Sequence, residues 1–372
     1  MKGISRRNQM KILHFGSNYL PNKGGNVVRM TSMLENNKYK NVELFIMTLA
    51  KKDNFDDEKY YRTTGIRIIR IPDFEFVKRN LKDIIKKYQI NIIVTHILPA
   101  TMIACKYAPS YVKIYTEIHS IIDSGKIKNF IKTLLYRYWL NKRIEKFFVL
   151  SKGAAKYIQD YYKVNPNRIV FLPNGVNKVV GNYQSGNSKY FTFGYVGTFY
   201  IWQGIKELYQ NIELILSISS NIRLYLVGGG EFENELKLLA KKYKERLIIT
   251  GLIPKNEVKE HMKEIDVLLI PRPSTLETET AIPLKIFDGV QYGKPVIISN
   301  VFGLTEVFDQ SQSFIYEPRD KNGLYKICNY VYKHPEKLKE IYESSVKRIQ
   351  AWYSWDSIHE IQYNTFKEVK SD

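Results

Sequence analysis

Short apolar runs typical of buried strands alternate with helical stretches along this chain, and the alternation starts afresh after residue 190. The first series of strand-like runs lies at residues 11–15, 42–48, 66–71, 90–95, 113–117 and 147–150. The second series lies at residues 191–196, 224–227, 247–250, 267–270 and 295–299. Strands separated by helices are typical of parallel βαβ units under a doubly wound sheet. The sequence therefore predicts an α/β fold in which this architecture occurs twice.

The length agrees with two domains, because 372 residues at about 100–200 per domain suffice for two separate cores. Helical patterns at 27–34, 81–88, 231–243 and 256–264 fill gaps between the strands. The polar stretch 177–189 contains Gly181 and Gly186, and we interpret it as the linker. The prediction is therefore two Rossmann-like domains in tandem, repeated in architecture and not in sequence.

Several protein classes are excluded by composition. The chain has only two cysteines, Cys105 and Cys328, so a disulfide framework and a thiolate zinc site are both ruled out. No apolar run reaches the roughly 18–20 residues of a membrane span. The basic residues 1–13 lead straight into a strand-like run, which argues against a cleaved signal peptide. A reducing compartment is expected.

The chain carries 57 Lys+Arg against 37 Asp+Glu, a formal charge of +20. Such an excess predicts an anionic partner, whether nucleic acid, an anionic membrane surface or a phosphorylated ligand. A bias toward Lys, Ile, Asn and Tyr, typical of AT-rich genomes, explains the same excess without function. Charge alone leaves both readings open.

Glycine-rich turns follow several predicted strands, where an open α/β sheet binds its ligands. The first is residues 22–26, with Gly24 and Gly25 between a strand and a helix. Adjacent glycines let the backbone approach a ligand closely, and a helix amino terminus favours an anion. An ordinary tight turn gives the same pattern.

The second half carries an ordered series of motifs. They read YVGTFYIWQG at 195–204, LVGGGE at 226–231, TGLIP at 250–254, AIPLKIFD at 281–288 and GKPVI at 293–297. The segment LPNGV at 172–176 lies at the domain junction. Together they resemble the GT-B glycosyltransferases, most closely glycosyltransferase family 4. The resemblance is strong over residues 147–310 and weaker over 1–146.

The resemblance implies two Rossmann-like domains whose parallel sheets face each other across a cleft. It places the acceptor-side domain at 1–180, the nucleotide-sugar domain at 188–350, and a helix crossing back to the first domain at 351–372. It further implies sugar transfer with retention at the anomeric carbon and without a divalent metal or other cofactor. The absence of an Asp-x-Asp pair at a strand end agrees with that.

The resemblance assigns donor contacts to the segment around 279–288. Asp288 stands where the family has a glutamate that binds the two ribose hydroxyls, and a shorter carboxylate can accept the same bonds. The family's second glutamate, a donor-sugar contact, falls at Thr280, so we favour neighbouring Glu279 in a catalytic role, with Glu277 as the alternative. Lys285, preceded by Leu284, is expected at the diphosphate.

Two cations of the family pattern are missing. The family has an arginine and a lysine at the positions that Thr198 and Gln203 occupy here. These two residues remain donor-binding candidates, but the lost charge must be supplied by Lys285 or by a set of other cations. That set comprises Arg272, Lys206 and Arg29.

The resemblance adds contacts from two other strand ends. His119 matches a histidine that contacts the donor sugar near the reaction centre, so we assign it a catalytic role. We expect Glu117 to point the opposite way and to serve in packing. Gly229 is expected to let the donor come close on the nucleobase side.

Residues 126–148 combine seven basic residues with aromatic and leucine side chains at helical spacing. Such a helix is typical of an anionic membrane surface. A helix packed on its domain with a lysine-rich solvent face is the alternative. Membrane association suits a lipid-linked acceptor.

The expected function is transfer of a hexosyl group from a UDP- or GDP-sugar to a glycan or polyprenyl-linked acceptor. The expected setting is cell-envelope polysaccharide synthesis, at the inner face of the cytoplasmic membrane. A non-catalytic GT-B subunit that supports a partner transferase and a GT-B sugar-nucleotide epimerase are the alternatives. No nucleic-acid module is recognisable, so nucleic acid is not expected as a partner.

Overall fold

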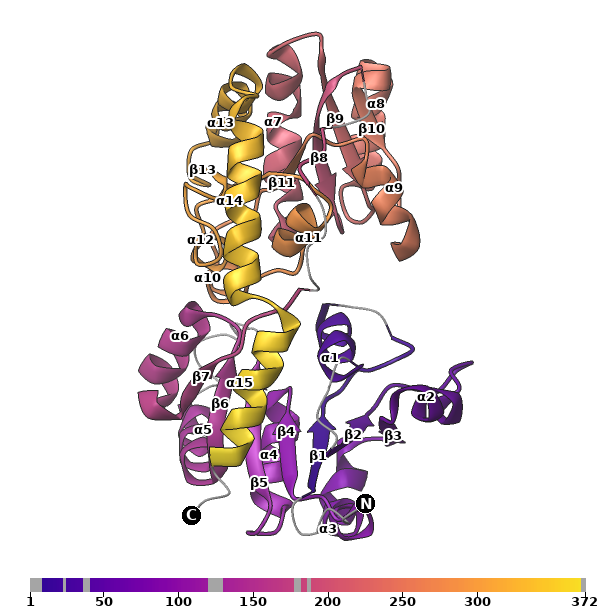
Figure 1. Cartoon of the computed structure of the whole chain (residues 1–372), viewed down its shortest axis with the longest axis vertical. Helices are drawn as coiled ribbons and strands as arrows, with labels where there is room; N and C mark the ends of the chain where they lie inside the picture. Colours follow the sequence, from indigo (N-terminus) through magenta and orange to yellow (C-terminus); the bar gives the residue numbers. More distant parts are fainter. Residues whose placement is uncertain are drawn as a thin grey trace. The chain divides into compact units, whose positions relative to one another are not determined.

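The computed structural model describes residues 9–22, 25–35, 41–119, 130–176, 182–185 and 189–368. The chain divides into two compact units (Figure 1). The first unit comprises Met1–Gly175 and Trp355–Asp372, and the second comprises Val176–Ser354. Most of the predicted linker, at 177–181 and 186–188, lies outside the described residues.

The first unit is built on a parallel sheet in the order β3-β2-β1-β4-β5-β6-β7. Its strands are β1 (Met10–Phe15), β2 (Val42–Thr48), β3 (Arg67–Arg70), β4 (Ile92–Thr95), β5 (Lys113–Ile118), β6 (Ile144–Val149) and β7 (Ile169–Phe171). Its helices are α1 (Gly25–Glu35), α2 (Asp57–Thr64), α3 (Phe74–Tyr88), α4 (Leu98–Tyr107), α5 (Phe130–Arg143), α6 (Lys152–Tyr162) and α15 (Trp355–Glu368).

The second unit has a parallel sheet in the order β10-β9-β8-β11-β12-β13. Its strands are β8 (Phe191–Val196), β9 (Ile222–Val227), β10 (Leu247–Ile249), β11 (Val267–Ile270), β12 (Val296–Ser299) and β13 (Phe314–Tyr316). Its α-helices are α7 (Ile205–Ser217), α8 (Glu233–Tyr243), α9 (Val258–Met262), α10 (Leu276–Thr280), α11 (Lys285–Gln291), α12 (Phe302–Thr305), α13 (Gly323–Lys333) and α14 (Lys337–Trp352).

The predicted α/β class with two parallel sheets is therefore confirmed. In each sheet the strand order reverses at one point, between β1 and β4 in the first unit and between β8 and β11 in the second. Parallel α/β sheets bind ligands beyond the carboxyl ends of the strands at such a reversal. A ligand site is therefore expected at each of these two points.

Burial explains why the strands were readable. All six residues of β9 are buried, and so are all four of β11 and β12. Strands covered on both faces read as continuous apolar runs in the sequence. In the second unit the helices α7 and α13 contribute leucines and isoleucines to the same core.

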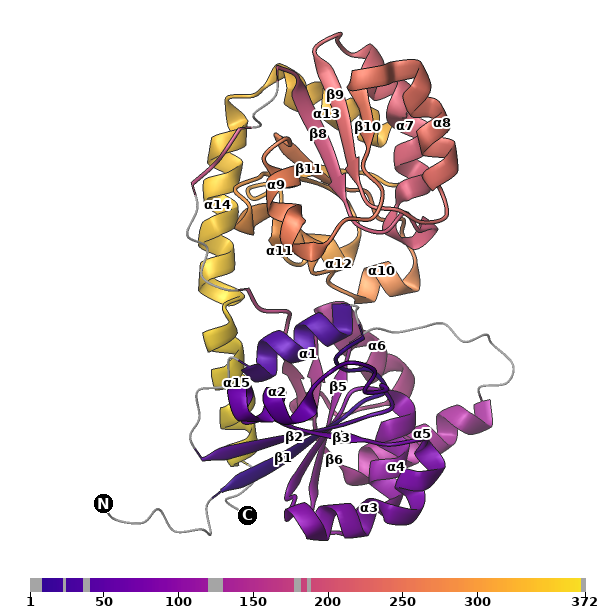
Figure 2. The ribbon, with the colours of Figure 1, turned by 90° about the vertical axis from the view of Figure 1, so that its right-hand side faces the viewer.

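The carboxyl-terminal helix α15 belongs to the first unit, where it can be followed in yellow in Figure 2. Phe366 of α15 packs edge-on against Tyr115 of β5, with ring centroids 4.8 Å apart. Trp355 lies against Gly175, where an added Cβ would come within 2.4 Å of the indole ring. The side chain that Gly175 lacks would thus collide with the start of the helix.

Helix α2 and the strands β7 and β13 are among the elements that the sequence did not predict. No element was assigned to the acidic stretch between residues 48 and 66, which contains α2; Asp56 caps this helix by accepting from the amides of Glu58 and Lys59. This helix buries no residue, so it lacks the apolar periodicity that reveals a helix in a sequence. The edge strands β7 and β13 were missed because strands of three residues show too little alternation to be recognised.

Candidate functional site

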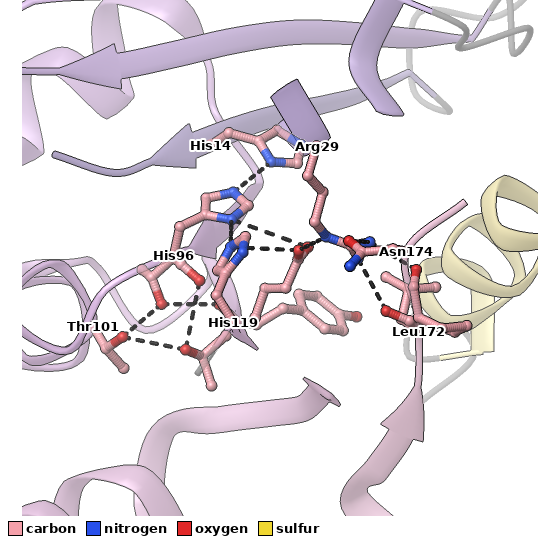
Figure 3. Close-up of polar contacts among 12 residues, drawn as sticks. His14, Arg29, His96, Thr101, His119, Leu172 and Asn174 are labelled. Carbon is pink, nitrogen blue, oxygen red and sulfur yellow. Dashed lines mark hydrogen bonds and ion pairs between the residues drawn. The ribbon is translucent and has the colours of Figure 1, made fainter. Parts of the chain in front are cut away.

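Three histidines meet at the strand-order reversal of the first unit (Figure 3). His14 lies in β1, His96 follows β4 directly, and His119 follows β5. His14 Nδ1 lies 2.9 Å from His96 Nε2, and His96 Nδ1 lies 3.0 Å from His119 Nε2. The rings therefore form a hydrogen-bonded chain in which each contact needs one proton between two nitrogens. At the His119 end of this chain, the ring nitrogen Nδ1 takes no part in these contacts.

The chain of histidines is neutral at physiological pH. Burial lowers the pKa of both His14 and His96 to about 3. Burial also lowers the pKa of His119, although the nearby carboxylate of Glu117 opposes that shift. A neutral imidazole both donates and accepts a hydrogen bond, so each ring can fix the tautomer of the next.

A buried ion pair adjoins the histidines. Arg29 of α1 donates from Nε to Glu117 Oε1 at 2.6 Å, and both side chains are shielded from solvent. The rest of the guanidinium is occupied by the carbonyls of Leu172 and Pro173 and by Asn174 Oδ1, at 2.7–3.1 Å. Burial opposes ionisation of Glu117, but the attraction of Arg29 and its hydrogen bond outweigh burial and lower the pKa of Glu117 to about 2.

This geometry corrects two expectations. We expected Glu117 to point away from His119, but Glu117 Oε1 lies 3.4 Å from His119 Nε2. Alternation along a strand places residues two apart on the same face, so the expectation misapplied the rule. Arg29 was a candidate for the diphosphate, but its hydrogen-bond donors are used inside the first unit.

The glycine turn of the first unit is described only in part. Gly25 is the first residue of α1, whereas Gly24 lies outside the described residues. The predicted donor contact at this turn stays a prediction.

In the second unit, Lys285 of α11 lies across the end of β8. Its Nζ is 3.4 Å from the Tyr195 hydroxyl and 4.6 Å from the centroid of that ring. Gly197 has φ +146, and a Cβ there would stand 2.6 Å from Lys285 Nζ, so the turn after β8 leaves the room that the ammonium occupies. Burial, then repulsion from Arg272, lowers the pKa of Lys285 to about 7, with Asp288 opposing.

Arg272 follows β11, the strand next to β8, and is buried. Its Nη1 donates to the carbonyl of Ala281 at 2.9 Å, while its Nε has no hydrogen-bond partner among the described residues. Burial lowers its pKa to about 10. Gly204 (φ +85) brings the start of α7 so close that a Cβ would stand 1.4 Å from the carbonyl oxygen of Pro271. Lys285 and Arg272 thus place two partly desolvated cations near one strand-order reversal.

Thr198 and Gln203, which stand where the family has an arginine and a lysine, differ in burial. Thr198 is exposed, and its carbonyl accepts from the Tyr195 hydroxyl at 2.7 Å. Gln203 is buried, and its Oε1 has no partner among the described residues. Gly229 lies beneath Glu233, whose carboxylate a Cβ would approach to 2.4 Å.

Glu279 and Thr280 of α10 are both held by hydrogen bonds within the second unit. Glu279 accepts from Ser274 Oγ and from the amide of Phe302, each at 2.7 Å. These bonds tie α10 to the start of α12 and use both carboxylate oxygens. Thr280 is buried and donates to the carbonyl of Leu276 at 2.7 Å. Leu284 and Asp288 are half-buried, one directly before α11 and the other in its first turn.

Sequence reasoning missed His14, His96 and Tyr195. His96 directly follows a strand, as His119 does, so the rule that selected His119 would have found it. His14 and Tyr195 lie within strands, where a polar or aromatic residue reads as core.

Two family models match the chain. The model described as Glycosyltransferase Family 4 matches residues 24–179, and the one described as Glycosyl transferases group 1 matches residues 190–334. The O-antigen biosynthesis glycosyltransferase WclY of Escherichia coli is 23% identical over 367 residues, covering 93% of this chain and 96% of that one.

A second relative is matched only in part. The Bacillus subtilis protein named "Putative teichuronic acid biosynthesis glycosyltransferase TuaC" is 25% identical over 175 residues, which is 46% of this chain and 41% of the relative. Among solved structures, a glycosyltransferase from Rickettsia africae has a TM-score of 0.77 at 16% identity, covering 98% of this chain and all of that one. Anabaena Alr3699/HepE in complex with UDP has a TM-score of 0.77 at 14% identity, with 96% and 100% covered.

Membrane crossing finds no support in the helices. No helix within the described residues is both long enough and apolar enough to cross a membrane.

Proposed function

Because this chain belongs to the family-4 glycosyltransferases and has the GT-B fold, we propose that it moves a sugar from a UDP- or GDP-sugar to a hydroxyl group, with retention. The acceptor we propose is a glycan or a polyprenyl-linked glycan of the cell envelope. Curated relatives named for O-antigen and teichuronic acid synthesis support that setting.

The observation that carries the proposal is the pair of cations at the β8–β11 reversal. Lys285 has its pKa lowered to about 7 by burial and by Arg272, so the two charges repel each other in a poorly solvated place. A bound diphosphate would relieve that repulsion and raise the pKa of Lys285 again. Cations held at the leaving group stabilise the charge that develops there as the glycosidic bond breaks.

Other residues have roles that follow from their positions. Asp288 lies one helical turn from Lys285, where its carboxylate would accept from the ribose hydroxyls. His119 would donate a hydrogen bond from Nδ1 to the donor sugar, with His96 fixing the tautomer. Neutral imidazole suits this role because it adds no second positive charge beside an oxocarbenium-like sugar. The leaving phosphate would take the acceptor proton on the same face, and we propose that no metal is needed at the diphosphate.

Glu279 stands differently. Its two carboxylate oxygens already accept hydrogen bonds from Ser274 and from the amide of Phe302, so Glu279 would hold α10 and α12 in place without contacting the donor itself. We therefore propose Glu279 as a positioning residue, and keep Asp288 and Lys285 as the direct donor contacts.

The function is tested by transfer itself. Purified protein is incubated with UDP- and GDP-sugars and a membrane extract that supplies acceptors, and the anomeric configuration of the product is read by NMR. We expect transfer with retention, and a loss of at least about tenfold in Asp288→Ala and in His119→Ala. Asp320→Ala, at a residue whose side chain is 38% exposed and pairs with Lys326, serves as the control for Asp288→Ala. Full activity in both variants, or turnover of the sugar nucleotide without any acceptor, would contradict the assignment.

The exposed side chains of helix α5 support binding of the protein to a membrane surface. Its exposed face carries Leu134, Leu135 and Tyr138, which are 46%, 53% and 54% exposed. Lys142 lies on the same face one turn further along, with its Nζ 5.1 Å from the Tyr138 ring centroid. The exposed face of the described part thus combines three apolar side chains with Asn141 and Lys142, as an interfacial helix does. Residues 126–129 of the predicted segment lie outside the described residues.

We propose that α5 docks on an anionic lipid surface at the cytoplasmic side of the membrane. The protein should co-sediment with vesicles containing phosphatidylglycerol, and Leu134→Ser/Leu135→Ser should weaken binding at least about tenfold, since each leucine contributes about 1.5–3 kcal/mol when buried in lipid. Leu238→Ser on α8, which is 68% exposed, is the matched control and should leave binding unchanged. Equal binding by both variants would exclude α5 as the membrane contact.

A further inference from the structure

Three ligand-type atoms converge at the β1–β4 reversal of the first unit, apart from the cations of the second. We propose that His96, Glu117 and His119 form a binding site for one divalent transition-metal ion, best matched by Zn²⁺. This inference concerns the first unit alone and does not rest on the proposed transfer activity.

Distances support the site. His96 Nδ1 and His119 Nε2 are 3.0 Å apart, His119 Nε2 and Glu117 Oε1 are 3.4 Å apart, and His96 Nδ1 and Glu117 Oε2 are 4.0 Å apart. Zinc binds nitrogen and oxygen at about 2.0–2.2 Å with tetrahedral geometry, so two of its ligand atoms stand about 3.4 Å apart. One ligand atom from each residue lies within 4.8 Å of the other two, so one ion could contact all three side chains after the ligand atoms move together by about 1 Å.

A second observation points independently to a missing ligand. Glu117 is 2% exposed, and its Oε2 has no hydrogen-bond partner among the described residues. A buried carboxyl oxygen without a hydrogen-bond partner carries a desolvation cost that a bound cation would offset. Arg29 engages only Oε1. The free oxygen lies on the His96 side of the cluster, where the metal would be placed.

The ring nitrogens meet in a way that a metal can use. Two imidazole nitrogens facing each other at 3.0 Å can share one proton or hold one cation between them. With Nδ1 bound to the metal, His96 would carry its one N–H proton on Nε2 and donate it to His14 Nδ1, and this hydrogen bond would orient the ligand.

The arrangement also predicts the strength and the open position of the site. Arg29 lies against the ligating carboxylate, and its positive charge opposes a cation, so we expect affinity in the micromolar range. Two histidines and one glutamate leave the fourth tetrahedral position for an oxygen ligand, either water or a substrate hydroxyl. His119 Nδ1 stays available for a hydrogen bond, so metal binding and the proposed sugar contact are compatible.

Cobalt provides a direct readout without substrate. Full-length protein stripped with chelator is titrated with Co²⁺ while the visible d–d bands of tetrahedral cobalt are recorded, and Zn²⁺ is then added in competition. We expect one equivalent of bound Co²⁺, displaced by one equivalent of Zn²⁺. His119→Gln should weaken binding more than about 100-fold, beyond the 10- to 100-fold typical of second-shell changes, and His14→Phe should fall within that range.

Matched controls separate this site from others. His334→Gln removes an exposed histidine paired with Glu336 and should leave the cobalt spectrum unchanged. His119 is the most exposed ligand, so His119→Gln is expected to fold, which circular dichroism checks; Glu117→Gln is a second test. Wild-type protein that binds no tetrahedral Co²⁺, or binding that survives His119→Gln and is lost in His334→Gln, would overturn the proposal.

Discussion

Replacing Arg29 with methionine is expected to lower the free energy of unfolding of the first unit by about 3–5 kcal/mol at pH 7, because it leaves a buried carboxylate without its partner. Glu117 is fully buried, and the guanidinium is its one hydrogen-bond donor among the described residues. The same substitution also frees the carbonyls of Leu172 and Pro173 from their donor. Native-state hydrogen exchange of peptides from β1 and β5 measures this unit separately from the other.

The loss should depend on pH in a defined direction. In the wild type the pKa of Glu117 is lowered from 4.5 to about 2, so its contribution to stability is complete above pH 4.5 and disappears as the pH falls through 2. In Arg29→Met the uncompensated burial raises that pKa instead, and the carboxyl takes up a proton. The difference between the two proteins should therefore be largest at neutral pH and smaller near pH 4.

A surface pair provides the control. Lys113 lies 3.4 Å from Glu145 in a partly exposed ion pair, and Lys113→Met should change stability by less than about 1 kcal/mol. A change as small in Arg29→Met as in Lys113→Met would show that the buried Arg29–Glu117 pair does not stabilise the first unit.

Replacing Lys285 with methionine is expected to reduce transfer about 100- to 1,000-fold, the range for losing one preorganised stabilising group at a developing charge. Folding should not suffer, because a poorly solvated ammonium beside Arg272 gives way to an apolar chain of similar length. Initial rates at saturating acceptor measure the loss of transfer, and the thermal midpoint of unfolding shows whether the variant is as stable as the wild type. Lys241→Met, which removes an exposed lysine on α8, should change neither the rate nor the thermal midpoint. Full activity in Lys285→Met would contradict the role of Lys285 at the diphosphate.

How far the sequence predicts this molecule depends on burial. Strands such as β9 and β11 were readable because they are covered on both faces, and their continuous apolar runs leave little choice. Helix α2 was not, because it is stabilised by its Asp56 cap and by exposed charges, and such features look like a loop in a sequence. The strand-order reversals required the whole topology, which no local pattern contains.

The candidate site was predictable only one residue at a time. The rule that ligands gather beyond strand ends selected His119 and Lys285, and the resemblance assigned their roles. It could not reveal that His14 and His96, 82 residues apart, are joined by a hydrogen bond. Arg29 misled because an arginine on a helix is usually exposed, whereas here it is 1% exposed and satisfied by backbone carbonyls.

The central claim, that two partly desolvated cations of the second unit bind a nucleoside diphosphate, is tested most directly by calorimetric titration with UDP and with GDP in EDTA. We predict micromolar binding of one of them at pH 6.5, weakening up to about tenfold per pH unit above 7, with proton uptake at pH 8.5 as Lys285 regains its charge. Lys285→Met should lose the pH dependence. Binding of neither nucleotide by folded protein would contradict the account, and a non-catalytic subunit would then fit the chain better.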